Sequence, residues 1–142
     1  MEWEGWQTPA WETPIDRADR VELLSLSERK IVPPDGWPDA FFRHVDRRVL
    51  LTGAEAQPII QRFRDLDPGE SARCHMPPWG LALYAGDALL FTVTLCYACD
   101  NAYVYTGSGK DLRAFDTQGQ NAVALRRALE QHLPLSRPYG DP

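Results

Sequence analysis

Three cysteines and one histidine, in two short motifs, are the side chains of this chain best suited to chemistry. The motifs are RCHMPP at residues 73–78 and CYACDN at residues 96–101. Thiolates together with an imidazole are the usual ligands of structural zinc. The candidate metal ligands are therefore Cys74, His75, Cys96 and Cys99, with His44 as the alternative imidazole.

The sequence between the motifs predicts a hairpin that brings them together. Residues 81–95, LALYAGDALLFTVTL, contain a two-residue turn at Gly86 and Asp87. Facing residues then have numbers that sum to 173, the sum of 86 and 87, so Cys74 faces Cys99. Cys96 lies about one turn of the pleat away, and the prolines at 77–78 distort the register.

Strand geometry weighs against a metal at this position. Cys96 and Cys99 point to opposite faces of a regular strand, so both reach one ion only if the chain between them bulges or turns. Cys74 and His75 are adjacent and also point apart. A buried cysteine more often packs as a small hydrophobic side chain than binds a metal. We therefore prefer the interpretation that these cysteines pack in the core without a cofactor. Bound zinc is the alternative.

Catalysis by a cysteine is disfavoured by the same placement. CYAC follows a strand, whereas a reactive Cys-x-x-Cys pair sits at a helix N-terminus that lowers the thiol pKa. The adjacency of Cys74 and His75 disfavours a nucleophile–base pair, and the sequence has no phosphate-loop or hydrolase motif. Carboxylates such as Asp65, Asp67 and Asp100 are interpreted as solvated loop charges. The sequence therefore leans away from an enzyme.

Composition limits the classes of partner. The chain has 142 residues and a net charge of −5, with a pI near 5.1. This size is typical of one domain, and the acidic balance argues against nucleic acid and favours a basic protein partner. There is no membrane-span or signal-peptide pattern, so we expect a cytoplasmic protein with reduced thiols.

Hydrophobic patterning predicts an α+β fold: an antiparallel sheet of about five strands with two main helices packed on it. Strands are expected at 21–27, 48–52, about 74–85, 88–98 and 102–106, with 88–98 central. One helix carries a stripe of Ile59, Ile60, Phe63 and Leu66. It begins at a Thr52–Glu55 capping box or at Gln57 with Pro58 in its first turn. A second helix begins near a Thr117–Gln120 capping box and ends at Pro134.

The chain divides into an N-terminal arm at 1–18, a single domain at 19–135 and a loose tail at 136–142. The arm contains Trp3, Trp6 and Trp11 among acidic residues and prolines. These indoles either cover the core of the domain or form an exposed segment that docks on a partner. They are the candidate partner-binding residues.

Three segments resemble a group of small uncharacterised bacterial proteins. They are TGAEAQ from residue 52, ARCHMPPWGL from residue 72 and LCYACDN from residue 95. The group pattern is a short helix, then Arg-Cys-His-x-Pro, then Cys-x-x-Cys-x-Asn, and the match covers roughly residues 48–106. Pro58 departs from it. The resemblance implies a bacterial source and a shared α+β fold, and it brings no reaction, cofactor or substrate.

These observations together predict a small acidic binding protein without catalysis of its own. An inhibitor or immunity-type partner of another bacterial protein is the expected role, because size, acidity and the tryptophans fit an interaction surface. The alternative is a zinc-binding protein, structural or enzymatic, that uses Cys74, Cys96 and Cys99.

Overall fold

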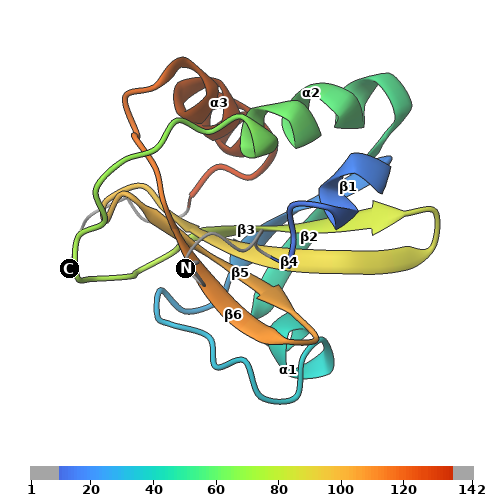
Figure 1. Cartoon of the computed structure of the whole chain (residues 1–142), viewed down its shortest axis with the longest axis horizontal. Coiled ribbons are helices and arrows are strands. Elements are labelled where there is room, and N and C mark those ends of the chain that lie inside the picture. Colours follow the sequence, from blue (N-terminus) through green and yellow to red (C-terminus); the bar gives the residue numbers. More distant parts are fainter. Residues whose placement is uncertain (1–9, 136–142) are drawn as a thin grey trace, which may run out of the picture.

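The computed structural model describes residues 10–135, which form a six-stranded antiparallel sheet with helices on both of its faces (Figure 1). The helices are a 3₁₀ turn η2 (Pro14–Arg17), α1 (Asp39–Phe42), α2 (Gly53–Arg64) and α3 (Gln120–His132). In Figure 1, α2 and α3 lie above the sheet and α1 lies below it. The α+β fold is as predicted, with six strands in place of five.

The strands lie in the order β2-β1-β3-β4-β5-β6, and all neighbours are antiparallel. The bounds are β1 (Arg20–Leu26), β2 (Val45–Thr52), β3 (Trp79–Ala85), β4 (Ala88–Cys96), β5 (Asn101–Thr106) and β6 (Gly109–Ala114). The turn at Gly86, which has φ of 57°, confirms the predicted hairpin. The residue numbers of facing pairs sum to 173 next to the turn, as in Tyr84 and Leu89. After a bulge they sum to 174, beginning with Leu83 and Phe91.

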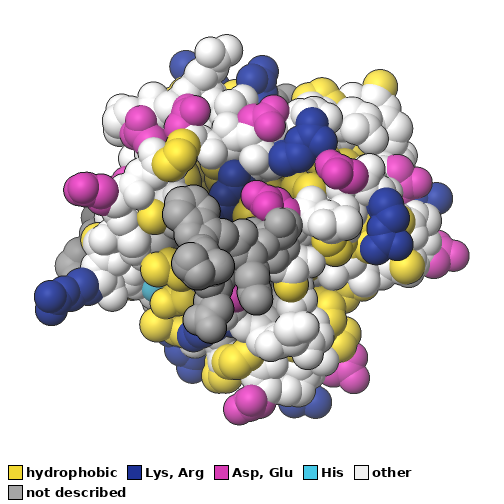
Figure 2. Space-filling view, viewed as in Figure 1, with side chains coloured by type: hydrophobic (Ala, Val, Ile, Leu, Met, Phe, Trp, Pro, Cys, Tyr) yellow, Lys and Arg dark blue, Asp and Glu magenta, His cyan; other side chains and the backbone are white. Residues whose placement is uncertain are grey.

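Charged side chains of both signs are interspersed on the face that Figure 2 shows. Neither sign forms a broad patch on this face, so the net charge of −5 is not concentrated here. Electrostatic recognition on such a surface depends on local groups of charges. Within residues 10–135, no helix is long and apolar enough to cross a membrane.

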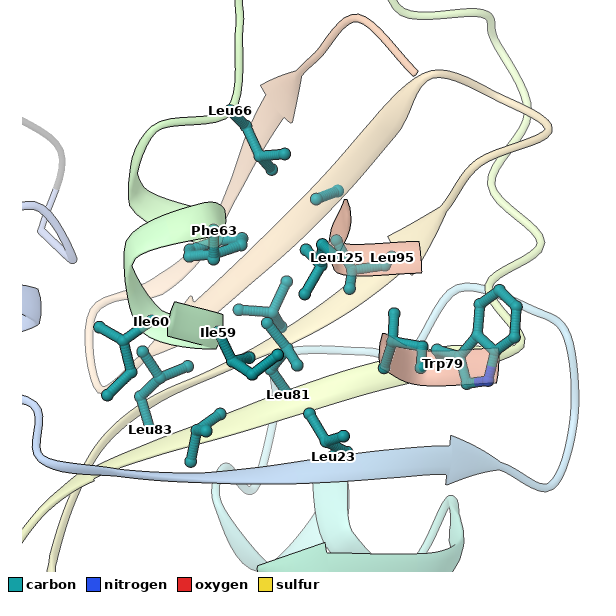
Figure 3. Packing of buried hydrophobic residues seen from close by; sticks show 14 of the residues in the cluster. Leu23, Ile59, Ile60, Phe63, Leu66, Trp79, Leu81, Leu83, Leu95 and Leu125 are labelled. Carbon is teal, nitrogen blue, oxygen red and sulfur yellow. The ribbon is translucent and has the colours of Figure 1, made fainter. Parts of the chain in front are cut away.

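The larger core lies between the sheet and the pair of helices α2 and α3. Figure 3 shows Ile59, Ile60 and Phe63 of α2 directed toward Leu81 and Leu83 of β3. Period-two alternation on the strands and period-3.6 spacing on α2 bring these apolar faces together. Phe63 is fully buried, and truncating such a side chain to alanine costs about 3–5 kcal/mol.

The opposite face of the sheet has a smaller core. Leu24, Ala82 and Tyr105 pack there against Phe41 of α1 and against Val32 in the preceding loop. Tyr105 fixes that loop further, because its hydroxyl donates to the Val32 carbonyl at 2.6 Å. Since β4 is covered on both faces, the prediction that it is a central strand is confirmed.

Helix α2 begins after Thr52, as the first of the two predicted starts required, and Pro58 lies inside it. Proline removes one helical hydrogen bond, to the carbonyl of Ala54. Both residues are exposed, so water can solvate that carbonyl. The predicted capping-box bonds are absent at the starts of α2 and α3, which have Thr52 and Gly119 as N-caps without side-chain cap bonds.

Candidate functional site

The cysteine motifs meet at one end of the sheet, where Cys74 and Cys99 form a disulfide with a Cα–Cα distance of 5.7 Å. The prediction that these two residues lie close together is confirmed, whereas the disulfide between them was not predicted. The expectation that all three thiols stay reduced is wrong in this structure. The cause is the turn at residues 97–100, which brings Cys99 within disulfide range of Cys74. Cys96 is buried outside the disulfide, and its Sγ accepts a hydrogen bond from the Met76 amide at 3.3 Å.

His75 is buried beside this disulfide, and hydrogen bonds engage both of its ring nitrogens. Nδ1 lies 2.6 Å from Asn101 Oδ1, and Nε2 lies 2.8 Å from Thr94 Oγ1. The Asn101 amide nitrogen donates to oxygens of Ser71, Ala72 and Cys74. Its Oδ1 is therefore the acceptor for Nδ1–H, and Nε2 accepts from the Thr94 hydroxyl. Burial lowers the pKa of His75, which keeps the ring neutral.

Thr94, His75 and Asn101 have the connectivity of a nucleophile, a base and an orienting group. Their exposed fractions are 0%, 5% and 2%, so a substrate has no route to the hydroxyl in this conformation. The Tyr103 ring covers the imidazole edge-on at a centroid distance of 4.6 Å. This group therefore fastens the chain before β3 to the sheet, and sequence reasoning did not identify it.

The four candidate metal ligands are close in space but are not arranged as a ligand set. No group of three or more His, Cys, Asp or Glu side chains within residues 10–135 is placed to hold a metal ion. A disulfide sulfur is not a thiolate, so zinc bound by Cys74, Cys96 and Cys99 requires prior reduction. His44 lies in the turn between α1 and β2, where its carbonyl accepts a hydrogen bond from the Ser27 hydroxyl.

An acidic hollow of about 540 Å³ opens next to the disulfide. We define it by its three acidic residues, Glu70, Asp100 and Asp116, and by Phe115. The other lining residues are Pro68, Gly69, Thr117 and Gln118. None of the three carboxylates is in an ion pair within residues 10–135, and no described cation lines the hollow. Such a hollow can attract a cationic side chain.

Three chain segments build the acidic hollow, and backbone contacts hold them together. The Asp116 amide donates to the Asp67 carbonyl at 2.9 Å, and the Phe115 amide donates to the Asp100 carbonyl at 3.1 Å. Gly69 permits this approach, because a Cβ there would lie 2.4 Å from the backbone of Phe115. Asp100 has φ of 55°, a left-handed conformation that aspartate tolerates better than most residues.

Two carboxylates of the acidic hollow are held in place by hydrogen bonds. Asp100 Oδ1 accepts from the Thr117 hydroxyl at 2.9 Å, and Asp116 Oδ1 accepts from the Gln118 amide at 2.9 Å. These bonds use one oxygen of each group and leave acceptor capacity on both carboxylates. The sequence interpretation of Asp100 as a solvated loop charge missed this convergence, because its partners come from segments far apart in the chain.

A second polar cluster joins Glu22, Arg48 and Tyr84 beside a smaller hollow of about 230 Å³. Arg48 donates to both carboxylate oxygens of Glu22, at 2.8 Å and 2.7 Å, and the Tyr84 hydroxyl also donates to Glu22. Burial raises the pKa of Glu22, but these hydrogen bonds outweigh it and hold the pKa below its ordinary value. The carboxylate is fully paired, so the cluster cross-links β2, β1 and β3.

Of the three predicted partner-binding residues, Trp11 is part of the core, and Trp3 and Trp6 lie outside the described residues. Trp11 is 4% exposed and packs on Phe63 and Phe91 at ring-centroid distances of 5.6 Å and 6.2 Å. Its indole therefore covers the core, the first of the two alternatives for the arm. The tail expected at 136–142 is also outside the described residues.

A comparison of the chain with known protein families, with curated proteins and with solved structures finds no match.

Proposed function

We propose that this chain is a small binding protein whose acidic hollow receives a basic side chain of a partner protein. The observation that carries this proposal is the convergence of Glu70, Asp100 and Asp116 on one hollow without a paired cation among the described residues. Carboxylates so placed attract a Lys or Arg and speed its association at low salt.

Exposed apolar side chains outside the acidic hollow support a protein partner over a free cation. Leu112 on β6 is 54% exposed and faces Tyr103 across the strand pair. Met76, next to His75, is 45% exposed. A partner that contacts these side chains gains apolar burial at about 25 cal/mol per Å² besides the ion pair. This combination suits an inhibitor or immunity-type protein without catalysis of its own, acting on another bacterial protein.

The test uses a fluorescently labelled octa-arginine peptide as a defined basic probe, with binding read by anisotropy. One variant removes two charges from the acidic hollow, Glu70→Gln with Asp116→Asn. The control removes two exposed carboxylates elsewhere, Asp35→Asn with Glu55→Gln, and so has the same net charge.

We expect the hollow variant to weaken binding about tenfold at low ionic strength, and the control by less than about twofold. Equal losses in the two variants would show attraction by net charge alone and would overturn the proposal. Metal content, measured on reduced protein, tests the zinc alternative separately.

A further inference from the structure

The Cys74–Cys99 disulfide connects two walls of the acidic hollow. One wall belongs to the connecting segment, defined here as residues 67–78 between α2 and β3, which contains Gly69 and Glu70. The other wall begins with Asp100, the residue after Cys99. The disulfide thus cross-links the irregular wall of the hollow to the turn that precedes β5 in the sheet.

Apart from the disulfide, hydrogen bonds hold the connecting segment, and most of them lie close to Cys74, through the side chains of His75 and Asn101. The segment has no helix or strand, and one isolated bridge pairs Pro68 with Phe115. The Ala72 amide donates to the Cys99 carbonyl at 2.9 Å, and the Asn101 side chain donates to the Cys74 carbonyl at 2.9 Å. Both bonds end within one residue of the disulfide or on it. Their geometry therefore depends on the disulfide being closed.

The disulfide is accessible from one side. Cys74 is exposed, whereas Cys99 is fully buried. The exposed residue Cys74 is therefore the expected point of attack by a thiolate from solution, since access is one of the factors that set the rate of thiol–disulfide exchange.

We infer that the Cys74–Cys99 disulfide is a redox-sensitive clasp that holds the connecting segment against the sheet and so keeps the acidic hollow in its binding shape. This inference rests on the proposed function for its effect on binding. A dithiol reductant opens the clasp: its first thiolate attacks Cys74 Sγ, the S–S bond breaks, and Cys99 leaves as a thiolate that takes up a proton.

The second thiol of the reductant then displaces Cys74. The reductant is oxidised to its own disulfide, and the two electrons and two protons appear as the thiols of Cys74 and Cys99. Without the covalent bond, the connecting segment retains its hydrogen bonds and the packing of His75 on Tyr103. The Glu70 wall can then separate from Asp100.

The first arm of the test compares the full chain before and after treatment with dithiothreitol by amide hydrogen exchange. We expect exchange of residues 67–78 to accelerate at least tenfold on reduction, while α3, which is packed on the core, keeps its rate. Alkylation under native conditions should label Cys74 quickly and the buried Cys96 slowly. Unchanged exchange in the connecting segment after reduction would overturn the clasp.

Variants separate loss of the disulfide from other effects of the reductant. Cys74→Ser with Cys99→Ser should behave like the reduced chain in both redox states. Cys96→Ser keeps the disulfide and should respond to reduction like the wild type. If the double variant fails to fold, reduced Cys96→Ser provides the same comparison on a chain that folded in its oxidised form.

The second arm measures octa-arginine binding in both redox states. We expect reduction to weaken binding about tenfold, as removal of the hollow charges does. If reduction speeds hydrogen exchange in the connecting segment but leaves the affinity for octa-arginine unchanged, the inference that the disulfide controls binding is overturned. Absence of binding by the oxidised chain would overturn the proposed function, and hydrogen exchange alone would then decide whether the clasp exists.

Discussion

His75 is a neutral side chain with a donor on one side and an acceptor on the other. Nδ1–H donates to Asn101, and Nε2 accepts from Thr94. A protonated ring would place two donors against a threonine hydroxyl and an amide oxygen, inside a buried pocket. Protonation is therefore disfavoured in the folded chain, and this has a consequence for stability at mildly acidic pH.

We expect the free energy of unfolding to fall as pH drops below about 6.5. The folded-state pKa of His75 is lowered, so the unfolded chain binds the proton first, and stability is lost from the unfolded pKa downward. The slope reaches at most about 1.4 kcal/mol per pH unit. Urea unfolding at intervals from pH 7.5 to pH 5 measures this slope.

A glutamine at this position can donate to Asn101 and accept from Thr94 without titrating. His75→Gln should flatten the slope between pH 6.5 and pH 5, whereas His132→Gln, on the partly exposed end of α3, should keep it. Equal slopes in the wild type and His75→Gln would contradict the assignment. Glu22 does not interfere, because its pKa is held below the ordinary value of 4.5 and its contribution is lost at lower pH.

Among the elements, β6 does more than extend the sheet, because it carries the cap of α2. The Arg113 guanidinium donates to the carbonyls of Phe63 at 2.6 Å and Arg64 at 2.8 Å, where α2 ends. It also lies over the Trp11 ring at 4.6 Å. Burial lowers the pKa of Arg113 to about 10, so it remains charged at neutral pH.

We expect Arg113→Met to lower the free energy of unfolding by about 2–3 kcal/mol. The change leaves buried carbonyls at the end of α2 without donors and removes a cation from the negative end of the helix. Arg127→Met, on an exposed position of α3, should change stability by less than about 0.5 kcal/mol. Denaturant midpoints of the two variants give the comparison. Similar midpoints would contradict the capping role.

Element prediction succeeded where periodicity was strong. Alternation predicted β1 and the β3–β4 hairpin, and the stripe through Ile59 and Phe63 predicted α2. Strand β6 was missed because Gly109–Ala114, GKDLRA, carries three charges and lacks an apolar alternation. An edge strand needs fewer apolar residues, because one of its sides has no neighbouring strand.

The candidate site was only partly predictable. The turn at Gly86 brought the two cysteine motifs to the same end of the hairpin, which local chemistry predicts, and the turn at residues 97–100 completed the approach of Cys99 to Cys74. The acidic hollow could not be predicted in the same way, because Glu70, Asp100 and Asp116 converge through tertiary contacts of an irregular segment. Burial of His75 depends likewise on Asn101 and Thr94, which lie 26 and 19 residues away.

At the scale of the whole molecule, β2 and β6 are the two edge strands of the sheet that residues 10–135 form. Charged residues interrupt both edges: Arg47 and Arg48 on β2, and Lys110 and Asp111 on β6. Such charges oppose edge-to-edge pairing of two chains. On β6 this matters most, because the neighbouring Leu112 is 54% exposed.

We expect Asp111→Val to promote self-association, because it creates an uncharged apolar pair with Leu112 on an edge strand. Light scattering coupled to gel filtration should then show a mass that rises with concentration. Asp35→Val removes the same charge from an exposed loop and should leave the mass unchanged. Association of both variants would instead indicate that loss of net charge is the cause.

The disulfide also closes a covalent ring in the chain, from which the N-terminal and C-terminal parts extend. Cys74 precedes the β3–β4 turn and Cys99 follows it, so the whole hairpin lies inside a ring closed across 25 positions of sequence. A protease that cuts once at Gly86–Asp87 opens the ring without separating the pieces. The nicked protein would migrate as one species on a denaturing gel and as two after a reductant is added.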